Sequence, residues 1–175
     1  VKIISDGVIK MDGGSMFGQV PKVAWENTVV TDRKNRMTLG LNCLLLQVGG
    51  QNVLVDTGIG TKEVDTDKEN LGLVPSRLLK GLKGVGLTPK DISAVILSHL
   101  HFDHAGGHYL FPNATFYAGQ GELAFANYPA KLGNFCFIPE QVAQYKHWTW
   151  REVPSLTDLD LFGDGSLVIM STPGH

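Results

Sequence analysis

The chain has 175 residues, of which 43% are hydrophobic and 18% are charged, and its formal net charge is −2 at pH 7. This length fits one globular domain with a sizeable core. The near-neutral charge offers no basic surface for a nucleic acid, and no run is long and apolar enough for a bilayer. We therefore expect neither a nucleic-acid nor a membrane partner. We expect a cytoplasmic location. The first residue is Val1 and not Met, so a signal peptide removed from the N-terminus is the alternative.

The two cysteines, Cys43 in LNCLLLQV and Cys136 in NFCFIP, lack the paired spacing of a thiolate metal site. Both sit among apolar residues, so we predict small buried side chains and no required disulfide.

The first third of the chain predicts β-strands. Lys2–Lys10 and Thr38–Val48 have the apolar content of strands, and a turn at Gly49–Gly50 leads into a short strand, Asn52–Asp56. The stretch GGSMFGQVPKVAWEN between the first two strands has no clean period, so we predict a loop there.

Helices and strands alternate in the rest of the chain. Apolar residues recur at helical spacing from Val74 to Val85, and Gly86 ends the pattern. Ala94–Leu97 is a continuous apolar run, which is typical of a strand covered on both faces. The order predicts an α/β fold with mixed strands, whose remaining elements are the strand Ala114–Ala118, the helices Glu122–Asn127 and Pro139–Tyr145, and the strands His147–Val153 and Leu167–Ser171.

A dense histidine cluster, SHLHFDHAGG, directly follows the strand at residues 94–97. Side chains two residues apart in an extended segment point the same way, so His99 and His101 can reach one cation. A turn at the alanine and glycines that follow would let Asp103 and His104 serve a second cation. Imidazole and carboxylate ligands suit zinc, iron or manganese. The alternative is a surface cluster without a metal, but the strand before the cluster and the glycines after it favour a metal site.

The stretch SHLHFDHAGG resembles the HxHxDH signature of the metallo-β-lactamase-fold hydrolases. NVLVDTGIG is similar to their strand-ending Asp-Thr-Gly element, and STPGH is similar to the segment that supplies their next metal histidine. Within this superfamily, HFDHAGG and GGSMFGQVPKVAWEN resemble the branch of acyl-homoserine lactonases and related organophosphate hydrolases.

The resemblance implies an αββα sandwich with the metals at one edge of the sheets. It implies that His99, His101 and His175 hold a first metal, with zinc expected and iron or manganese as alternatives. Asp103 and His104 would help to hold a second metal. The family also places a bridging aspartate and another histidine downstream of PGH, where this chain ends. We therefore expect residues 1–175 to be one metallo-β-lactamase-like domain with an incomplete C-terminal lobe, about the N-terminal two thirds of the whole.

Three further residues take their expected roles from the same resemblance. Asp56 would orient the metal-binding loop, with a simple turn residue in DTG as the alternative. His108 and His147 match no family ligand, so we expect His108 in a loop near the site and His147 on a strand or at the surface.

The resemblance implies a metal-dependent hydrolase that acts on a small-molecule lactone or ester, with an acyl-homoserine lactone-like substrate favoured. Three protein ligands and one open position are the pattern of catalytic zinc, which lowers the pKa of bound water to about 7. The resulting hydroxide would attack the carbonyl while Asp103 manages the proton. One alternative is an iron-dependent oxygenase or di-iron redox member of the superfamily. Another is an inactive metal-binding fragment that pairs with a partner or with its own copy.

The apolar residues of the segment predicted as a loop have two interpretations. Met16, Phe17, Val20 and Trp25 could form a wall or lid of a substrate pocket. The alternative, which we favour, is packing or a subunit contact, as in a homo-oligomer.

Overall fold

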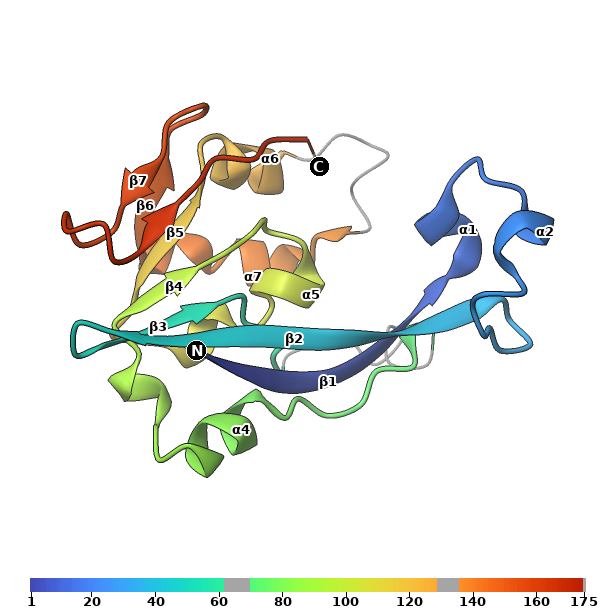
Figure 1. Ribbon diagram of the computed structural model, residues 1–175, viewed down its shortest axis with the longest axis horizontal. Helices are drawn as coiled ribbons and strands as arrows, with labels where there is room; N and C mark the ends of the chain where they lie inside the picture. The colour runs from blue at the N-terminus through green and yellow to red at the C-terminus, as the bar shows by residue number, and fades with distance from the viewer. Residues whose placement is uncertain (62–69, 129–135, 175) are drawn as a thin grey trace.

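A computed structural model of the chain describes residues 1–61, 70–128 and 136–174. A six-stranded sheet has the order β1-β2-β3-β4-β5-β6, and β7 and β8 form a second, two-stranded sheet (Figure 1). β1, β2 and β3 are antiparallel neighbours, whereas β3, β4, β5 and β6 run parallel. The strands are β1 (Lys2–Asp12), β2 (Arg36–Val48), β3 (Gln51–Val55), β4 (Ala94–Ile96), β5 (Thr115–Gly119), β6 (Thr149–Val153), β7 (Leu159–Asp160) and β8 (Val168–Ile169). The predicted α/β fold with mixed strands is confirmed.

The helices in the described part of the chain are short, and none of them is long and apolar enough to cross a membrane. The α-helices are α1 (Gly13–Phe17), α2 (Lys22–Trp25), α4 (Leu78–Gly84), α5 (Phe102–Ala105), α6 (Glu122–Asn127) and α7 (Pro139–Val142). The 3₁₀-helices are η1 (Pro89–Asp91), η2 (His108–Leu110) and η4 (Tyr145–His147).

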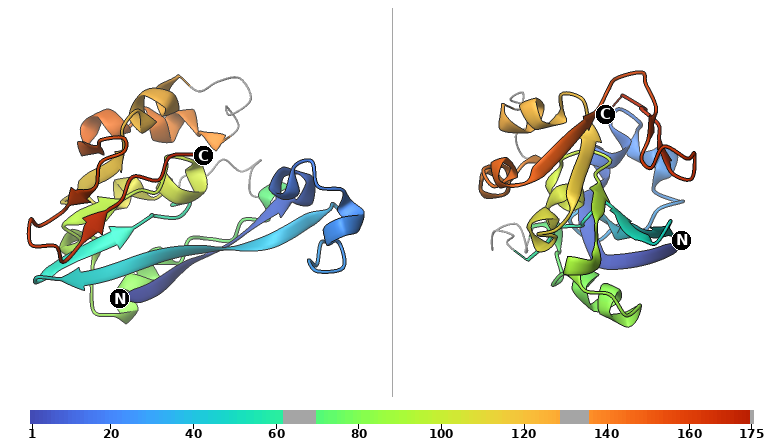
Figure 2. Two further views of the ribbon diagram at one scale, coloured as in Figure 1. Left: turned by 45° about the horizontal axis from the view of Figure 1, so that its top comes forward. Right: turned by 90° about the vertical axis from the view of Figure 1, so that its left-hand side faces the viewer.

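The two faces of the large sheet have different covers, because successive strand residues point to opposite faces. Figure 2 shows α6 and α7 on one side of the sheet and the β7–β8 pair on the other. The helix-covered core contains Leu45, Leu54, Val95 and Phe116 from the strands and Leu78 and Leu82 from α4. The opposite core contains Leu46, Val53, Tyr117 and Val153, with Leu159 and Ile169 from the small sheet packed against them.

The prediction of a loop for GGSMFGQVPKVAWEN was wrong, because α1 and α2 lie there. They have five and four residues, too few for a helical period to show in the sequence. The side chain of Asp12 caps α1 by accepting the N–H of Ser15 at 3.1 Å. The paired ends of β1 and β2 carry both helices away from the rest of the molecule, and we call residues 12–36 the arm (Figure 1).

The helix predicted from Val74 begins only at Leu78. Pro75 disfavours helical backbone at Val74, and Asp6 captures the N–H groups of Arg77 and Leu78. Other boundaries were also wrong: the helix predicted at 139–145 divides into α7 and η4, the strand predicted from His147 begins at Thr149, and the strand predicted at 167–171 is only Val168–Ile169. The strand β7 was not predicted.

Close packing of α5 against the loop after β3 requires glycine at two positions. Thr57 donates its N–H and its hydroxyl to the carbonyl of His104, at 2.7 and 2.9 Å. A Cβ atom on Gly106 would overlap the carbonyl oxygen of Ile59, and one on Gly107 would overlap that of Thr57. The loop and α5 therefore approach each other at backbone distance.

We expect Gly106→Ala to lower the free energy of unfolding by about 1–3 kcal/mol, since backbone must shift to admit the methyl group. Gly84→Ala is the matched control, because Gly84 is an exposed helical residue with open space around it. That change should raise stability by about 0.5–1 kcal/mol. Urea unfolding of both variants measures the difference, and equal stability of Gly106→Ala and the wild type would contradict the close packing.

Candidate metal centre

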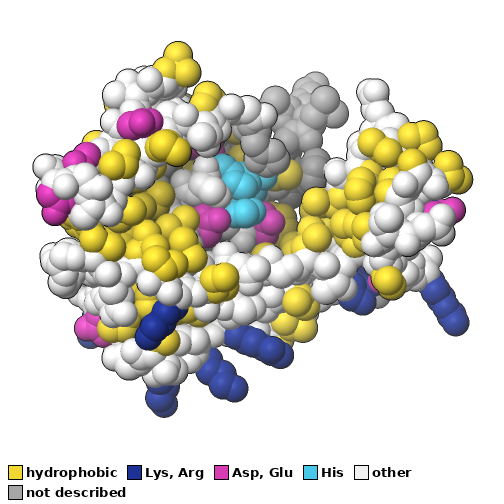
Figure 3. All heavy atoms as spheres, in the orientation of Figure 1, with side chains coloured by type: hydrophobic (Ala, Val, Ile, Leu, Met, Phe, Trp, Pro, Cys, Tyr) yellow, Lys and Arg dark blue, Asp and Glu magenta, His cyan; other side chains and the backbone are white. Residues whose placement is uncertain are grey.

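The histidine cluster lies where the chain leaves β4 and turns into α5. The imidazole of His99 lies 4.4 Å from that of His101 and 4.2 Å from that of His104, measured between ring centroids. Figure 3 shows histidine side chains in a hollow near the middle of one face, with acidic side chains beside them. These three predicted metal ligands are thus neighbours at the carboxyl end of a parallel strand, where ligands commonly bind.

The potential metal donors contact one another directly. Nε2 of His99 lies 3.0 Å from Nδ1 of His101, and Nε2 of His104 lies 3.5 Å from Oδ2 of Asp103. Within residues 1–61, 70–128 and 136–174, no three histidine, cysteine or carboxylate side chains are arranged to hold an ion. The donor types nevertheless fit zinc, which binds imidazole and carboxylate ligands. His175 lies outside the described residues, so its role as a ligand stays a prediction.

Asp56 lies directly after β3, in left-handed backbone with φ of 58°. Its Oδ1 accepts the N–H of Ser98 at 2.9 Å, and its Oδ2 lies 2.7 Å from Nδ1 of His104. A turn residue alone does not require these side-chain contacts. In metal sites such a carboxylate fixes the tautomer of a ligating histidine. Here Asp56 favours a proton on Nδ1 of His104 and leaves Nε2 facing Asp103.

The acidic neighbours also change the proton affinity of His104. Burial of the ring by itself lowers the pKa of His104, but the hydrogen bond to Asp56 and the charges of Asp103 and Asp56 raise it. The net effect is a raised pKa. The two carboxylates therefore make the site favourable for positive charge.

Ser98 is a site residue to which sequence reasoning gave no role. Its hydroxyl lies 3.1 Å from Oδ2 of Asp56, 3.1 Å from Nδ1 of His99 and 3.3 Å from Nδ1 of His104. One small side chain thus joins two histidines and the carboxylate beside them. Its position immediately before His99 was the available signal, but the contact with Asp56 depends on the pairing of β3 with β4.

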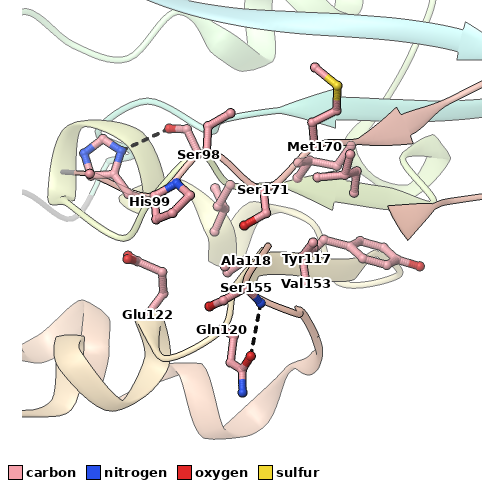
Figure 4. A pocket seen from close by; sticks show the side chains of 17 residues that line it. Ser98, His99, Tyr117, Ala118, Gln120, Glu122, Val153, Ser155, Met170 and Ser171 are labelled. Carbon is pink, nitrogen blue, oxygen red and sulfur yellow. Dashed lines mark hydrogen bonds between the residues drawn. The ribbon is translucent and has the colours of Figure 1, made fainter. Parts of the chain in front are cut away.

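A cavity of about 510 Å³ opens beside the histidines (Figure 4). Ser98, His99 and Glu122 line it on one side, and apolar side chains such as Val153 and Met170 line it elsewhere. The cavity therefore joins a possible metal centre to a partly apolar surface.

The predicted substrate-pocket residues lie in the arm and do not line this cavity. Trp25 is buried and stacks on Phe17 with 4.5 Å between ring centroids, as the packing interpretation expects. Met16 and Val20 are about half exposed. A part for Met16, Phe17 or Trp25 in substrate binding stays a prediction.

His108 was predicted in a loop near the site, but it is a fully buried core residue at the start of η2. Its Nδ1 lies 3.0 Å from the carbonyl oxygen of Ala105, and its ring packs edge-on against Tyr145. His147 is exposed at the end of η4, which matches the surface interpretation and not the strand. Cys43 is buried as predicted, whereas Cys136 is only partly buried, and both are free.

Comparison with known proteins identifies the family of the chain. The family model described as the metallo-beta-lactamase superfamily matches residues 38–175. A metallo-hydrolase, mfmC, of Annulohypoxylon moriforme is 27% identical over 94% of this chain and 48% of its own length. An N-acyl homoserine lactonase of Bacillus cereus is 29% identical over 81% of this chain and 56% of its own length. The chain thus spans about half the length of these curated relatives.

A solved structure gives the same result for the fold. A probable metal-dependent hydrolase from Staphylococcus aureus superimposes with a TM-score of 0.83 and 28% identity, over 91% of this chain and 60% of the other. The family match covers most of the chain and includes both the histidine cluster and the strands that position it. The chain therefore belongs to the metallo-beta-lactamase superfamily.

Proposed function

We propose that the protein is a metal-dependent hydrolase that cleaves a lactone or ester. One observation carries the proposal: three histidines and two carboxylates meet at the carboxyl end of β4, beside an open cavity. These residues are His99, His101, His104, Asp56 and Asp103. The names of the relatives, a metallo-hydrolase and a lactonase, support the same reaction class.

The proposed ligands of a first zinc ion are His99, His101 and His175, and those of a second are Asp103 and His104. A zinc ion in such a site acidifies bound water and polarises a carbonyl group. The remaining tasks fall to the side chains of the chain itself. Asp56 holds His104 in one tautomer, and Asp103 is the proposed carboxylate that accepts and returns the proton during hydrolysis.

The cavity supports a substrate with both a polar and an apolar part. Ser98, His99 and Glu122 provide a polar wall near the reacting group, whereas Val153 and Met170 offer apolar contact for a chain. An acyl-homoserine lactone has this division, and one relative carries the name of a lactonase for that class. We therefore propose acyl-homoserine lactones as the first substrates to test.

The test is zinc analysis of the purified protein together with pH-stat hydrolysis of N-hexanoyl-homoserine lactone and a simple aryl ester. We expect zinc-dependent turnover that a chelator abolishes. Asp103→Asn should lower kcat by about 10²–10⁴-fold, the usual contribution of a positioned acid or base. Tightly held iron with oxygen consumption and no hydrolysis would instead favour the oxygenase alternative. Zinc-loaded protein without hydrolysis of either substrate would contradict the proposal.

A further inference from the structure

Glu122 contacts the histidine cluster from an element far along the chain. It is the first residue of α6, and its Oε2 accepts the N–H of Leu100 at 3.1 Å. Leu100 lies between His99 and His101. In Figure 4 the carboxyl group of Glu122 extends from α6 toward His99 at the wall of the cavity.

This hydrogen bond satisfies a backbone group in irregular structure. β4 ends at Ile96 and α5 begins at Phe102, so the N–H of Leu100 lies outside both elements. Leu100 is only 1% exposed. A buried N–H without an acceptor destabilises the folded state, and an ionised carboxylate makes a stronger hydrogen bond than a neutral acceptor. Glu122 is therefore well suited to hold this peptide in one orientation.

The cluster is thus held at two points by carboxylates from different elements. Asp56 binds the N–H of Ser98, just before His99, and Glu122 binds the N–H between His99 and His101. α6 is itself fixed, because Ala126 is buried in the core.

We propose that Glu122 is a positioning residue of the metal centre, an inference that rests on the proposed function. By holding the Leu100 peptide, it keeps the imidazoles of His99 and His101 directed toward the same cation. It acts through the backbone, and its hydrogen bond needs an acceptor oxygen at the end of a side chain of this length.

The test measures zinc affinity by competition with a chromophoric chelator. Glu122→Ala should bind zinc about tenfold more weakly, at the lower end of the 10–100-fold loss typical when groups that orient ligands are removed. Glu122→Gln keeps an acceptor oxygen at the same reach and should stay within about threefold of the wild type. Glu122→Asp keeps the charge but is one methylene shorter, so it should resemble Glu122→Ala. The visible absorption of the cobalt(II)-substituted proteins should change with Ala and Asp but not with Gln.

Glu152→Ala is the matched control. It removes a carboxylate that accepts the N–H of Gly121, the residue before Glu122, and that accepts no hydrogen bond from residues 98–104 in the described part of the chain. Its zinc affinity should stay within about twofold of the wild type, since no ligand-orienting bond is lost. Circular dichroism checks folding. If Glu122→Ala does not fold, the comparison of Glu122→Gln with Glu122→Asp decides the result.

The outcomes separate this inference from the proposed function. A wild-type protein that binds zinc, with Glu122→Ala and Glu122→Asp binding equally well, overturns only the inference. Loss of affinity in Glu122→Gln as large as in Glu122→Ala also overturns it. A wild-type protein that binds no zinc overturns the proposed function itself.

Discussion

Asp6→Ala should lower the free energy of unfolding by about 3–5 kcal/mol, because more than one buried donor would lose its acceptor at about 1–3 kcal/mol each. Asp6 lies in β1 and is fully buried. Its Oδ2 accepts the N–H of Ile59 at 3.0 Å, and its Oδ1 accepts those of Arg77 and Leu78 at 3.0 and 2.9 Å. The hydroxyl of Ser76 donates to the same oxygen. One carboxylate thus joins the first strand, the loop after β3 and the start of α4.

Alanine would leave the buried N–H groups of Ile59 and Leu78 without this acceptor, and each buried group left in this way costs about 1–3 kcal/mol. The N–H of Arg77 would keep its second acceptor, the main-chain carbonyl oxygen of residue 6, at 2.9 Å. Urea unfolding followed by circular dichroism measures the loss. Asp91→Ala is the control, because Asp91 also accepts an N–H and a hydroxyl, both from Thr88 at 2.7 Å, but in the exposed turn of η1. It should lose only about 1 kcal/mol, as for a helix cap. A loss in Asp6→Ala no larger than in the control would show that Asp6 does not organise the fold.

Asp56→Asn should weaken zinc binding by about 10–100-fold, as expected when the partner of a ligating histidine is altered. Asparagine tolerates the left-handed backbone at this position and can still accept the N–H of Ser98 with its one oxygen. Its amide nitrogen would then face Nδ1 of His104. Because both groups would be donors, His104 would move its proton to Nε2, the nitrogen that faces Asp103.

Asp56→Ala provides the comparison for this tautomer effect. It removes the partner of His104 altogether, so its zinc affinity should fall in the same range. Chelator competition gives the affinities, and urea unfolding separates loss of metal from loss of fold. Zinc binding by Asp56→Asn at wild-type strength would show that the tautomer of His104 is not set by Asp56.

The sequence alone predicted the features that depend on local pattern. The apolar run at residues 94–97 identified β4, and the cluster after it could be placed at the end of a strand because strands in α/β folds present ligands there. The mutual approach of His99, His101 and His104 followed from their spacing and the turn at the glycines.

What the sequence could not predict depends on contacts between distant segments. Asp6 reads as an ordinary polar residue in a strand, but it binds residues more than fifty positions away. Glu122 reads as a helix-start residue, and its contact with Leu100 exists only because β5 pairs with β4. His108 is buried because Tyr145 packs on it from a later element. Periodicity carries no information on these pairings.

The parallel pairing of β3, β4 and β5 also determines when the histidine cluster can take its final form. Asp56 reaches the cluster from the end of β3, so its contact requires β3 beside β4. Glu122 reaches the cluster from beyond β5, so its contact requires β5 beside β4. Contacts between segments so far apart in sequence form slowly during folding. The two carboxylates therefore hold the histidine cluster only once the pairing of β3, β4 and β5 is complete.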